Sequence, residues 1–297
     1  MQTRTAKLAR SMSEAWASVI GVLGGRPLSF VLKELVAPRN YVALARMARV
    51  CERPLDVARR YLLGGGDYPF VCGVRTPLGV VRPTLYSHHD VWTLSEIFCR
   101  EDYRAGSETA VVVDVGSNIG LSGLYFLTRN ANCRCYLFEP DPRNVQRLRE
   151  NLSGLDGRWS LEEAAVGPTG GFVSFGREPT GRYGAVGAST PDTIEVRCLS
   201  IDDVLEDVLA REGAIHVLKI DTEGLEADTV SAIRPELLER IDVVYFESQT
   251  PMRLHEDRFA SSFANETVTL RRQSPDGGPN TALIRSRHHA TPDDGSD

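Results

Sequence analysis

Short apolar runs alternate with amphipathic stretches along most of the chain. The first is a run of three valines at residues 111–113 that leads to Asp114 and Val115, and such a β-branched run is typical of a strand buried on both faces. Four more runs of strand length follow, separated by stretches of helical periodicity, at residues 133–139, 159–166, 214–221 and 241–248. This alternation predicts an α/β fold with a doubly wound, mostly parallel sheet. Two further strand-like runs in residues 267–285, around a turn at 274–280, predict an antiparallel final hairpin.

The region before this alternation has a different pattern. Apolar residues recur at helical spacing over residues 12–63, with arginines interleaved, which predicts an N-terminal helical appendage with a basic, solvated face. Three glycines at 64–66 interrupt the pattern, so we expect an appendage at 1–66 and a main domain at 67–286. Residues 287–297 are polar and contain Pro, Gly and Asp, a composition typical of a disordered tail.

Two hairpins are expected within the main domain. Residues 69–86 hold two strand-like runs that turn near Thr76, Pro77 and Leu78. Residues 170–198 form a second hairpin-like insertion, whose middle contains three glycines and is therefore expected to be mobile.

The strand at 111–115 leads into a glycine turn that contains Asp114, Gly116, Asn118 and Gly120. Glycine lets the backbone approach a ligand closely, and the helix-like segment that follows offers free N–H groups and a positive dipole end. Asp114, at the carboxyl end of the strand, is placed to accept hydrogen bonds from an amine or a hydroxyl. The pattern predicts a nucleotide-type pocket, with a plain strand–turn–helix connection as the alternative.

The glycine spacing indicates which nucleotide would bind. Dinucleotide folds use Gly-x-Gly-x-x-Gly, whereas Asn118 stands here where the second glycine would fall. A carboxylate, an amide and a tight turn suit an amino-acid-bearing nucleoside, such as S-adenosylmethionine, better than a diphosphate. Glu139 closes the next strand nineteen residues after Gly120, where an acid can accept both hydroxyls of a ribose. The alternative for Glu139 is a surface carboxylate near a helix start.

Further acids are expected at the same edge of the sheet. Asp221 and Glu223 end the fourth strand and Glu247 ends the fifth, and ligands of open α/β sheets bind beyond the carboxyl ends of strands. Several carboxylates in one crevice repel one another unless a cation, a cationic ligand or protons lie among them. The sulfonium of S-adenosylmethionine is such a cation. Helix N-capping is the alternative role for Asp221 and Glu223, and both roles can hold together.

Composition narrows the class of protein. The chain has 297 residues and a net charge of −6, which argues against general nucleic-acid binding. Residues 1–60 carry +7 and the remainder −13, so the basic charge is confined to the appendage. The six cysteines include no C-x-x-C spacing, which indicates neither a zinc site nor a disulfide framework and favours a reducing cytoplasm. No stretch is long enough to span a bilayer, and no signal peptide is expected.

The motifs form an ordered set: Asp114-Val-Gly-Ser-Asn-Ile-Gly120, Phe138-Glu139-Pro140, Val196-Arg-Cys-Leu-Ser-Ile-Asp-Asp203, Lys219-Ile-Asp-Thr-Glu-Gly-Leu-Glu226 and Phe246-Glu247. Together they resemble the FkbM family of S-adenosylmethionine-dependent methyltransferases, over roughly residues 86–285. One departure is Ile201, where family members more often have leucine, and this exchange keeps the spacing.

The resemblance implies a seven-stranded Rossmann-like methyltransferase sheet and a site for S-adenosylmethionine. The methionine part would be bound by the turn residues Asp114, Gly116, Asn118 and Gly120. Glu139 would hold the ribose, and the end of the third strand would flank the adenine through Glu163 and Ala164.

An alcohol acceptor benefits from a base that takes its proton as the new bond forms. The candidates are Asp221, Glu247, His88 and His89. The two histidines precede a predicted helix and would close over the cofactor, with an exposed pair near a helix start as the alternative. No His, Asp and Glu spacing demands a metal, so none is predicted. A divalent ion at Asp221 is the alternative, because other O-methyltransferases place a metal ligand there.

The favoured function is O-methylation of a hydroxyl on a sugar, glycolipid or secondary metabolite, so the expected partner is a small-molecule, glycan or glycolipid acceptor. One alternative is a nicotinamide-dependent oxidoreductase, which Asn118 disfavours. Another is a non-catalytic cofactor-binding scaffold whose basic N-terminal segment docks a partner or an anionic membrane. Variable loops would form the acceptor pocket, at residues 170–198, 249–266 and the N-terminal helices. The apolar helix faces near the N-terminus favour a homodimer.

Overall fold

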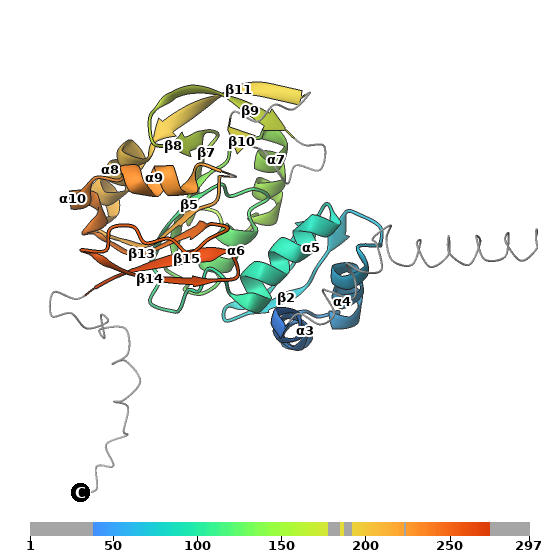
Figure 1. Cartoon of the computed structure of the whole chain (residues 1–297). Coiled ribbons are helices and arrows are strands. Elements are labelled where there is room, and N and C mark those ends of the chain that lie inside the picture. Colours follow the sequence, from blue (N-terminus) through green and yellow to red (C-terminus); the bar gives the residue numbers. More distant parts are fainter. Residues whose placement is uncertain (1–37, 178–184, 187–191, 223, 274–297) are drawn as a thin grey trace, which may run out of the picture.

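The structure is a computed structural model that describes residues 38–177, 185–186, 192–222 and 224–273. Its centre is a seven-stranded sheet in the order β14-β15-β13-β12-β5-β6-β7 (Figure 1). The strands are β5 (Val111–Val115), β6 (Arg134–Phe138), β7 (Trp159–Glu162), β12 (Ile215–Ile220), β13 (Ile241–Glu247), β14 (Phe259–Ala264) and β15 (Thr267–Arg272). The five strands from β13 to β7 are parallel, while β15 is antiparallel to both β13 and β14. The predicted doubly wound, mostly parallel sheet is confirmed.

Burial explains why β5 lies at the middle of the five parallel strands. All five of its residues, four valines and Asp114, are buried, as expected for a strand in which polar and apolar positions do not alternate. Its neighbours β12 and β6 run parallel to it, and the register places Lys219 on β12 and Leu137 on β6 beside Asp114. The ends of these strands therefore meet at one edge of the sheet.

The antiparallel hairpin that the structure describes at the end of the sheet begins earlier in the sequence than the predicted one. The structure forms it from β14 and β15, with the turn at Asn265 and Glu266, whose φ angles are 51° and 64°. Two consecutive residues with positive φ make the tight turn that suits the twist of a hairpin. The sequence prediction placed the turn at residues 274–280, which lie outside the described residues together with the second predicted strand.

The predicted strand at 159–166 is divided between two sheets. Its first part is β7 of the main sheet, and its second part is β8 (Ala165–Gly167), which pairs with β11 (Asp192–Ser200). The insertion predicted at 170–198 is confirmed as a hairpin of β9 (Gly171–Arg177) and β11. The glycines in its middle lie outside the described residues. β10 (Ala185–Val186) completes the small sheet, in the order β10-β9-β11-β8.

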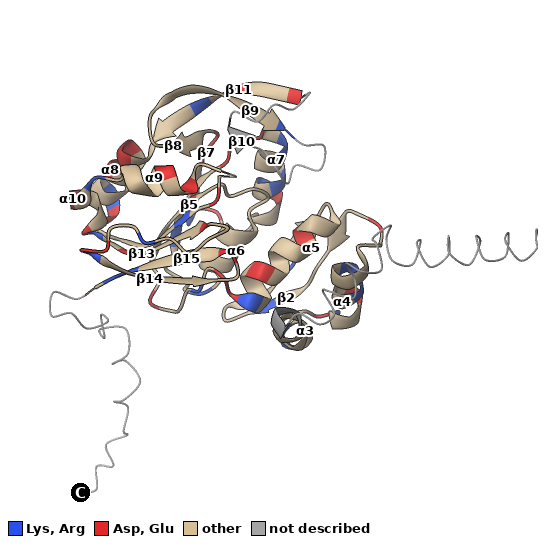
Figure 2. Ribbon diagram, in the orientation of Figure 1, with Lys and Arg blue, Asp and Glu red and all other residues tan. Residues whose placement is uncertain are grey.

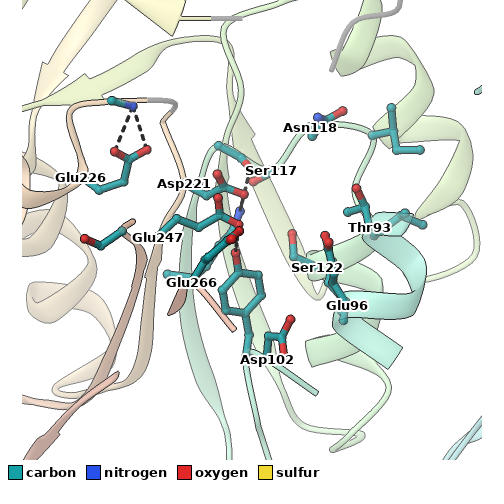
Figure 3. A pocket seen from close by; sticks show the side chains of 18 of the residues that line it. Thr93, Glu96, Asp102, Ser117, Asn118, Ser122, Asp221, Glu226, Glu247 and Glu266 are labelled. Carbon is teal, nitrogen blue, oxygen red and sulfur yellow. Dashed lines mark hydrogen bonds and ion pairs between the residues drawn. The ribbon is translucent and has the colours of Figure 1, made fainter. Parts of the chain in front are cut away.

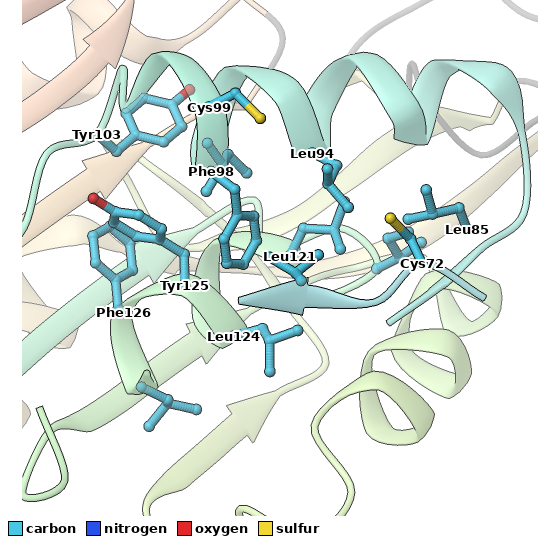
Figure 4. Packing of buried hydrophobic residues seen from close by; sticks show 14 of the residues in the cluster. Cys72, Leu85, Leu94, Phe98, Cys99, Tyr103, Leu121, Leu124, Tyr125 and Phe126 are labelled. Carbon is cyan, nitrogen blue, oxygen red and sulfur yellow. The ribbon is translucent and has the colours of Figure 1, made fainter. Parts of the chain in front are cut away.

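Helices cover both faces of the main sheet (Figure 1). One face packs against α8 (Ile201–Glu212), α9 (Glu226–Ala232) and α10 (Pro235–Leu238). The other packs against α6 (Leu121–Leu127) and α7 (Pro142–Asn151), and against a longer helix made of α5 (His88–Leu94) and the π-helical η1 (Ser95–Arg100). Figure 4 shows Leu94, Phe98, Leu121 and Tyr125 filling the space between α5–η1 and α6. This packing fixes α5–η1 beside the glycine turn that precedes α6.

The described part of the N-terminal region joins the same hydrophobic core. Helices α3 (Pro38–Val50) and α4 (Pro54–Leu63) confirm the helical pattern over residues 38–63, and residues 12–37 lie outside the described residues. Met47 and Val57 are fully buried in the cluster that contains Tyr125 of α6. Arg46 donates a hydrogen bond to the carbonyl of Cys99 on η1 at 2.9 Å. α3 and α4 therefore brace α5–η1 from the side away from the sheet.

The predicted hairpin at 69–86 is confirmed as two nested antiparallel pairs. β2 (Val74–Thr76) pairs with β3 (Gly79–Val81), and β1 (Phe70–Val71) pairs with β4 (Thr84–Leu85). Within the part of the chain that the structure describes, no helix is long and apolar enough to cross a membrane.

Candidate functional site

A cavity of about 640 Å³ lies beyond the carboxyl ends of β5, β12 and β13. Its walls are the turn after β5, the loop after β12, the end of β13 and the helix α5–η1. Figure 3 shows Asp221 and Glu247 on one wall, with Thr93 and Glu96 of α5–η1 on the other. The packing of α5–η1 onto α6 therefore closes the side of the pocket that a bare sheet edge would leave open.

Gly116 makes the turn after β5 possible. Its φ is 75°, and a Cβ atom at this position would lie 1.8 Å from the carbonyl oxygen of Asp221. The backbone after β5 contacts the backbone after β12 at this point, and only glycine, which has no Cβ atom, fits there. Gly120, with φ 85°, precedes α6, and Asn118 has a positive φ of 48°. The tight glycine turn predicted from the sequence is confirmed.

Asp114 lies beneath the floor of the cavity rather than in it. Its side chain is fully buried, and its Oδ2 accepts a hydrogen bond from the Ser122 hydroxyl at 2.6 Å. Its Oδ1 lies 3.1 Å from the Nζ atom of Lys219. Both Ser122 and Lys219 line the cavity, so Asp114 acts on the pocket through these two side chains.

Lys219 is the cation that lies among the acids at the strand ends. Its ammonium is buried between Asp114 and Asp221, 3.4 Å from Asp221 Oδ2, and donates a hydrogen bond to the Gly116 carbonyl at 2.7 Å. Burial alone would lower the pKa of Lys219, but the two carboxylates outweigh it and raise that pKa above its usual value. Sequence reasoning expected a bound sulfonium to balance these acids and missed the lysine that already does so. A lysine in a mostly apolar strand, two residues before Asp221, was the available signal.

Asp221 and Glu247 meet in the cavity as predicted. Burial raises the pKa of Asp221, and the Lys219 ammonium opposes this rise. Glu247 Oε1 lies 3.2 Å from the hydroxyl of Tyr103, a buried residue of the segment after η1 that sequence reasoning also missed. Burial raises the pKa of Tyr103 well above its usual value, so its phenol stays protonated and donates to Glu247.

Glu139 holds the glycine turn from the side of β6. Its Oε2 accepts a hydrogen bond from the Asn118 backbone N–H at 2.8 Å, and its Oε1 accepts one from Asp141 N–H at 2.9 Å. Burial raises the pKa of Glu139 to about 7, although these two N–H groups favour the ionised form. Asp114 and Glu139 therefore flank one turn from opposite sides, but neither is among the residues that line the cavity.

Glu226 shapes the loop after β12. Its carboxylate accepts hydrogen bonds from the backbone N–H groups of Thr222, at 2.8 Å, and Gly224, at 2.9 Å. The dashed lines at Glu226 in Figure 3 mark the contacts with Gly224. It is therefore a structural acid, although it lines the cavity. Glu223 lies outside the described residues.

Four predicted site residues lie away from the cavity. His88 and His89 stack on each other at the start of α5, with ring centroids 3.8 Å apart, and both contact the edge of Trp92. Glu163 is half exposed and forms an ion pair with Arg149 at 2.7 Å. Ala164 is buried beside the end of β7.

The described residues include no group of three or more His, Cys, Asp or Glu side chains that could hold a metal ion. The sequence prediction kept a divalent ion at Asp221 as its alternative. In the structure, the cation beside Asp221 is the ammonium of Lys219.

The family model of the methyltransferase FkbM domain matches residues 114–271, which include the glycine turn, Lys219, Asp221 and Glu247. This chain belongs to the FkbM methyltransferase family. The match begins at Asp114, near the end of β5, and ends in β15, so it includes most of the main sheet and the main-sheet walls of the cavity but not α5–η1.

Two curated relatives are similar to this FkbM protein. The hexuronic acid methyltransferase AglP of Haloferax volcanii is 26% identical over 157 residues, 51% of this chain and 64% of AglP. The matched part therefore spans less than two thirds of AglP. The 2-O-methyltransferase NoeI of Sinorhizobium fredii is 28% identical over 203 residues, 59% of this chain and 79% of NoeI. Among solved structures, the FkbM methyltransferase of Methylobacillus flagellatus is 17% identical with a TM-score of 0.41, covering 78% of this chain and 59% of that chain.

Proposed function

We propose that this FkbM family protein is an S-adenosylmethionine-dependent methyltransferase that O-methylates a hydroxyl of a sugar, glycolipid or secondary metabolite. The observation that carries the proposal is the cavity in which a glycine turn faces the acids at the ends of β12 and β13. The names of AglP and NoeI, a hexuronic acid methyltransferase and a 2-O-methyltransferase, support a sugar acceptor. The six free, buried cysteines support a reducing compartment such as the cytoplasm.

The residues present fit this cofactor. Backbone groups of Gly116, Ser117 and Asn118 line the cavity, and no Cβ projects from Gly116. The carboxylate of Asp221 provides negative charge for a cationic ligand. When bound, S-adenosylmethionine supplies an electrophilic methyl group on its sulfonium. In this proposal Gly116, Asn118 and Gly120 shape the methionine site, while Asp114 fixes it through Lys219 and Ser122.

The ribose and adenine would lie on the β6 side of the turn. Glu139 is the proposed ribose acceptor there, with its carboxylate now held by the N–H groups of Asn118 and Asp141. The adenine would pack near Ala164, with Glu163 at the same strand end. These assignments follow the resemblance to the FkbM family, and for Glu139 they are supported by its hydrogen bond to the Asn118 backbone N–H in the glycine turn.

Glu247 is the proposed general base. It lines the cavity, and the Tyr103 hydroxyl orients its carboxylate by donating to Oε1. The opposite oxygen can take the proton of an acceptor hydroxyl as that oxygen attacks. Asp221 is held by Lys219, and the two histidines stack outside the cavity lining, so all three are weaker choices.

Transfer of a labelled methyl group from S-adenosylmethionine tests this function. We expect labelled product from a panel of neutral and amino glycosides and glycolipids, and a fall of about 100-fold in turnover for Glu247→Gln. The matched control is Glu212→Gln, because Glu212 also accepts from a tyrosine, Tyr136, but lies outside the cavity lining. Absence of label in every acceptor, or full turnover by Glu247→Gln, would contradict the proposal.

A further inference from the structure

The cavity lining is strongly acidic. Seven of the side chains that line it are Asp or Glu, whereas Lys219 is the one basic side chain of the lining within the described part of the chain. Figure 2 shows acidic segments on α5–η1, on α9 and in the loops beside them. An acceptor therefore enters a region of negative potential.

Lys219 is not available to bind an anionic group of an acceptor. Its ammonium is buried between Asp114 and Asp221 and donates to the Gly116 carbonyl. Within the residues that the structure describes, Arg100 pairs with the lining acids Asp102 and Glu96 but does not itself line the cavity. Neither cation is available to bind a carboxylate or a phosphate on an acceptor.

The seven acids differ in what they contact, and two of them, Asp102 and Asp221, lie in ion pairs with Arg100 and Lys219. Asp90 and Glu226 accept backbone N–H bonds and hold local structure. Glu96, Glu247 and Glu266 come from three separate elements, namely η1, the end of β13 and the turn between β14 and β15. Glu266 adjoins Thr267, the cross-strand partner of Glu247, so these two carboxylates lie on the wall that faces Glu96 across the cavity (Figure 3).

The cofactor of the proposed function does not neutralise this charge. S-adenosylmethionine carries one sulfonium, one ammonium and one carboxylate, a net charge of +1. Seven carboxylates line the cavity, and the cations beside them are Lys219 in the lining and Arg100, which pairs with Asp102 and Glu96. The carboxylates therefore still outnumber the positive charges once the cofactor is bound. This excess favours a cation beside the acceptor hydroxyl and opposes an anion.

We infer that the acceptor carries a protonated amine, as an amino sugar does, and that the cavity excludes uronic acids and sugar phosphates. The inference rests on the proposed function, since it concerns the acceptor of that same site. Glu96, Glu247 and Glu266 set this selectivity by surrounding the amine. In this respect the protein would differ from its relative AglP, whose name specifies a hexuronic acid.

Binding of three matched probes tests the inference on the full chain. The methyl glycosides of glucosamine, glucose and glucuronic acid share one ring and differ in charge. Their affinities are measured by calorimetry at neutral pH, with and without S-adenosylhomocysteine. We expect the glucosaminide to bind at least tenfold more tightly than the glucoside, the glucuronide to be the weakest, and added salt to reduce the difference.

The double variant Glu96→Gln, Glu266→Gln should lower the preference for the amine at least threefold. Glu236→Gln is the control, because Glu236 is an exposed acid of α10 outside the cavity lining and should change nothing. Equal or tighter binding of the glucuronide, or no binding of the glucosaminide in either condition, overturns the inference. Failure of S-adenosylhomocysteine to bind overturns the proposed function instead, and the probe series without it still reports the charge preference.

Discussion

The Nζ atom of Lys219 lies 3.1 Å from Oδ1 of Asp114, at adjacent register positions of β12 and β5, with both side chains almost completely buried. When a buried charge loses its partner, no ion-pair attraction offsets the free-energy cost of its removal from water. Lys219 also contacts Asp221 and the Gly116 carbonyl, so the pair connects the sheet interior to both sides of the cavity floor.

Lys219→Met should therefore lower the free energy of unfolding by about 3–5 kcal/mol, because it leaves Asp114 charged and unpaired. Asp114→Asn should have a cost of the same kind. The double variant should recover part of the loss, and urea denaturation of all four proteins measures the coupling. Strictly additive effects would show that the pair is not coupled.

Gly116→Ala should destabilise the protein by at least about 2 kcal/mol more than Gly154→Ala. Both glycines have positive φ, 75° and 84°, so alanine is strained at each. A Cβ at 116 would also lie 1.8 Å from the Asp221 carbonyl, whereas one at 154 would meet nothing within 4 Å. Equal losses of unfolding free energy would mean that the backbone contact between the turn and Asp221 is not tight.

Glu139 should make stability depend on pH. Burial raises its pKa from 4.5 to about 7, so the folded protein holds an extra proton between these values. Its contribution to the free energy of unfolding is complete below pH 4.5 and is lost as pH rises to about 7. The total loss is roughly 3 kcal/mol, because one pKa unit corresponds to about 1.4 kcal/mol. The measurement is the unfolding free energy of the wild type minus that of Glu139→Gln at several pH values. A difference that stays constant or grows in favour of the wild type with rising pH would refute this prediction.

Tyr103→Phe should slow turnover and move its pH profile. Loss of the donor at Oε1 disfavours ionised Glu247, so the acidic limb of the kcat profile should shift upward by about one pH unit. Affinity for S-adenosylhomocysteine should stay unchanged. Tyr136→Phe is the matched control, because Tyr136 donates to Glu212 at 2.7 Å outside the cavity lining. A uniform loss of rate at every pH would indicate a structural role alone.

The sequence was sufficient where local pattern determines structure. The valine-rich run at 111–115 predicted a buried strand, and the glycines after it predicted a tight turn, because positive φ and close backbone contact disfavour other residues. Asp221 and Glu247 could be placed in one cleft because parallel strands end at one edge of the sheet.

Other features depend on tertiary context that local pattern does not contain. Lys219 lies between two acids because of the register of β12 against β5, and Tyr103 reaches Glu247 because η1 packs on α6. The sequence prediction did not include the hairpin of β14 and β15, since the Asn265–Glu266 turn lacks the glycine or proline that usually marks one. His88 and His89 follow Ser87, which caps α5, and stack at its start rather than over the cavity.

Calorimetric titration with S-adenosylhomocysteine tests the cofactor assignment most directly. We predict one site per chain with a micromolar dissociation constant, about −8 kcal/mol, and at least tenfold weaker binding by a folded Asn118→Ala variant. Binding of NADH by the wild type with no response to S-adenosylhomocysteine would contradict the account.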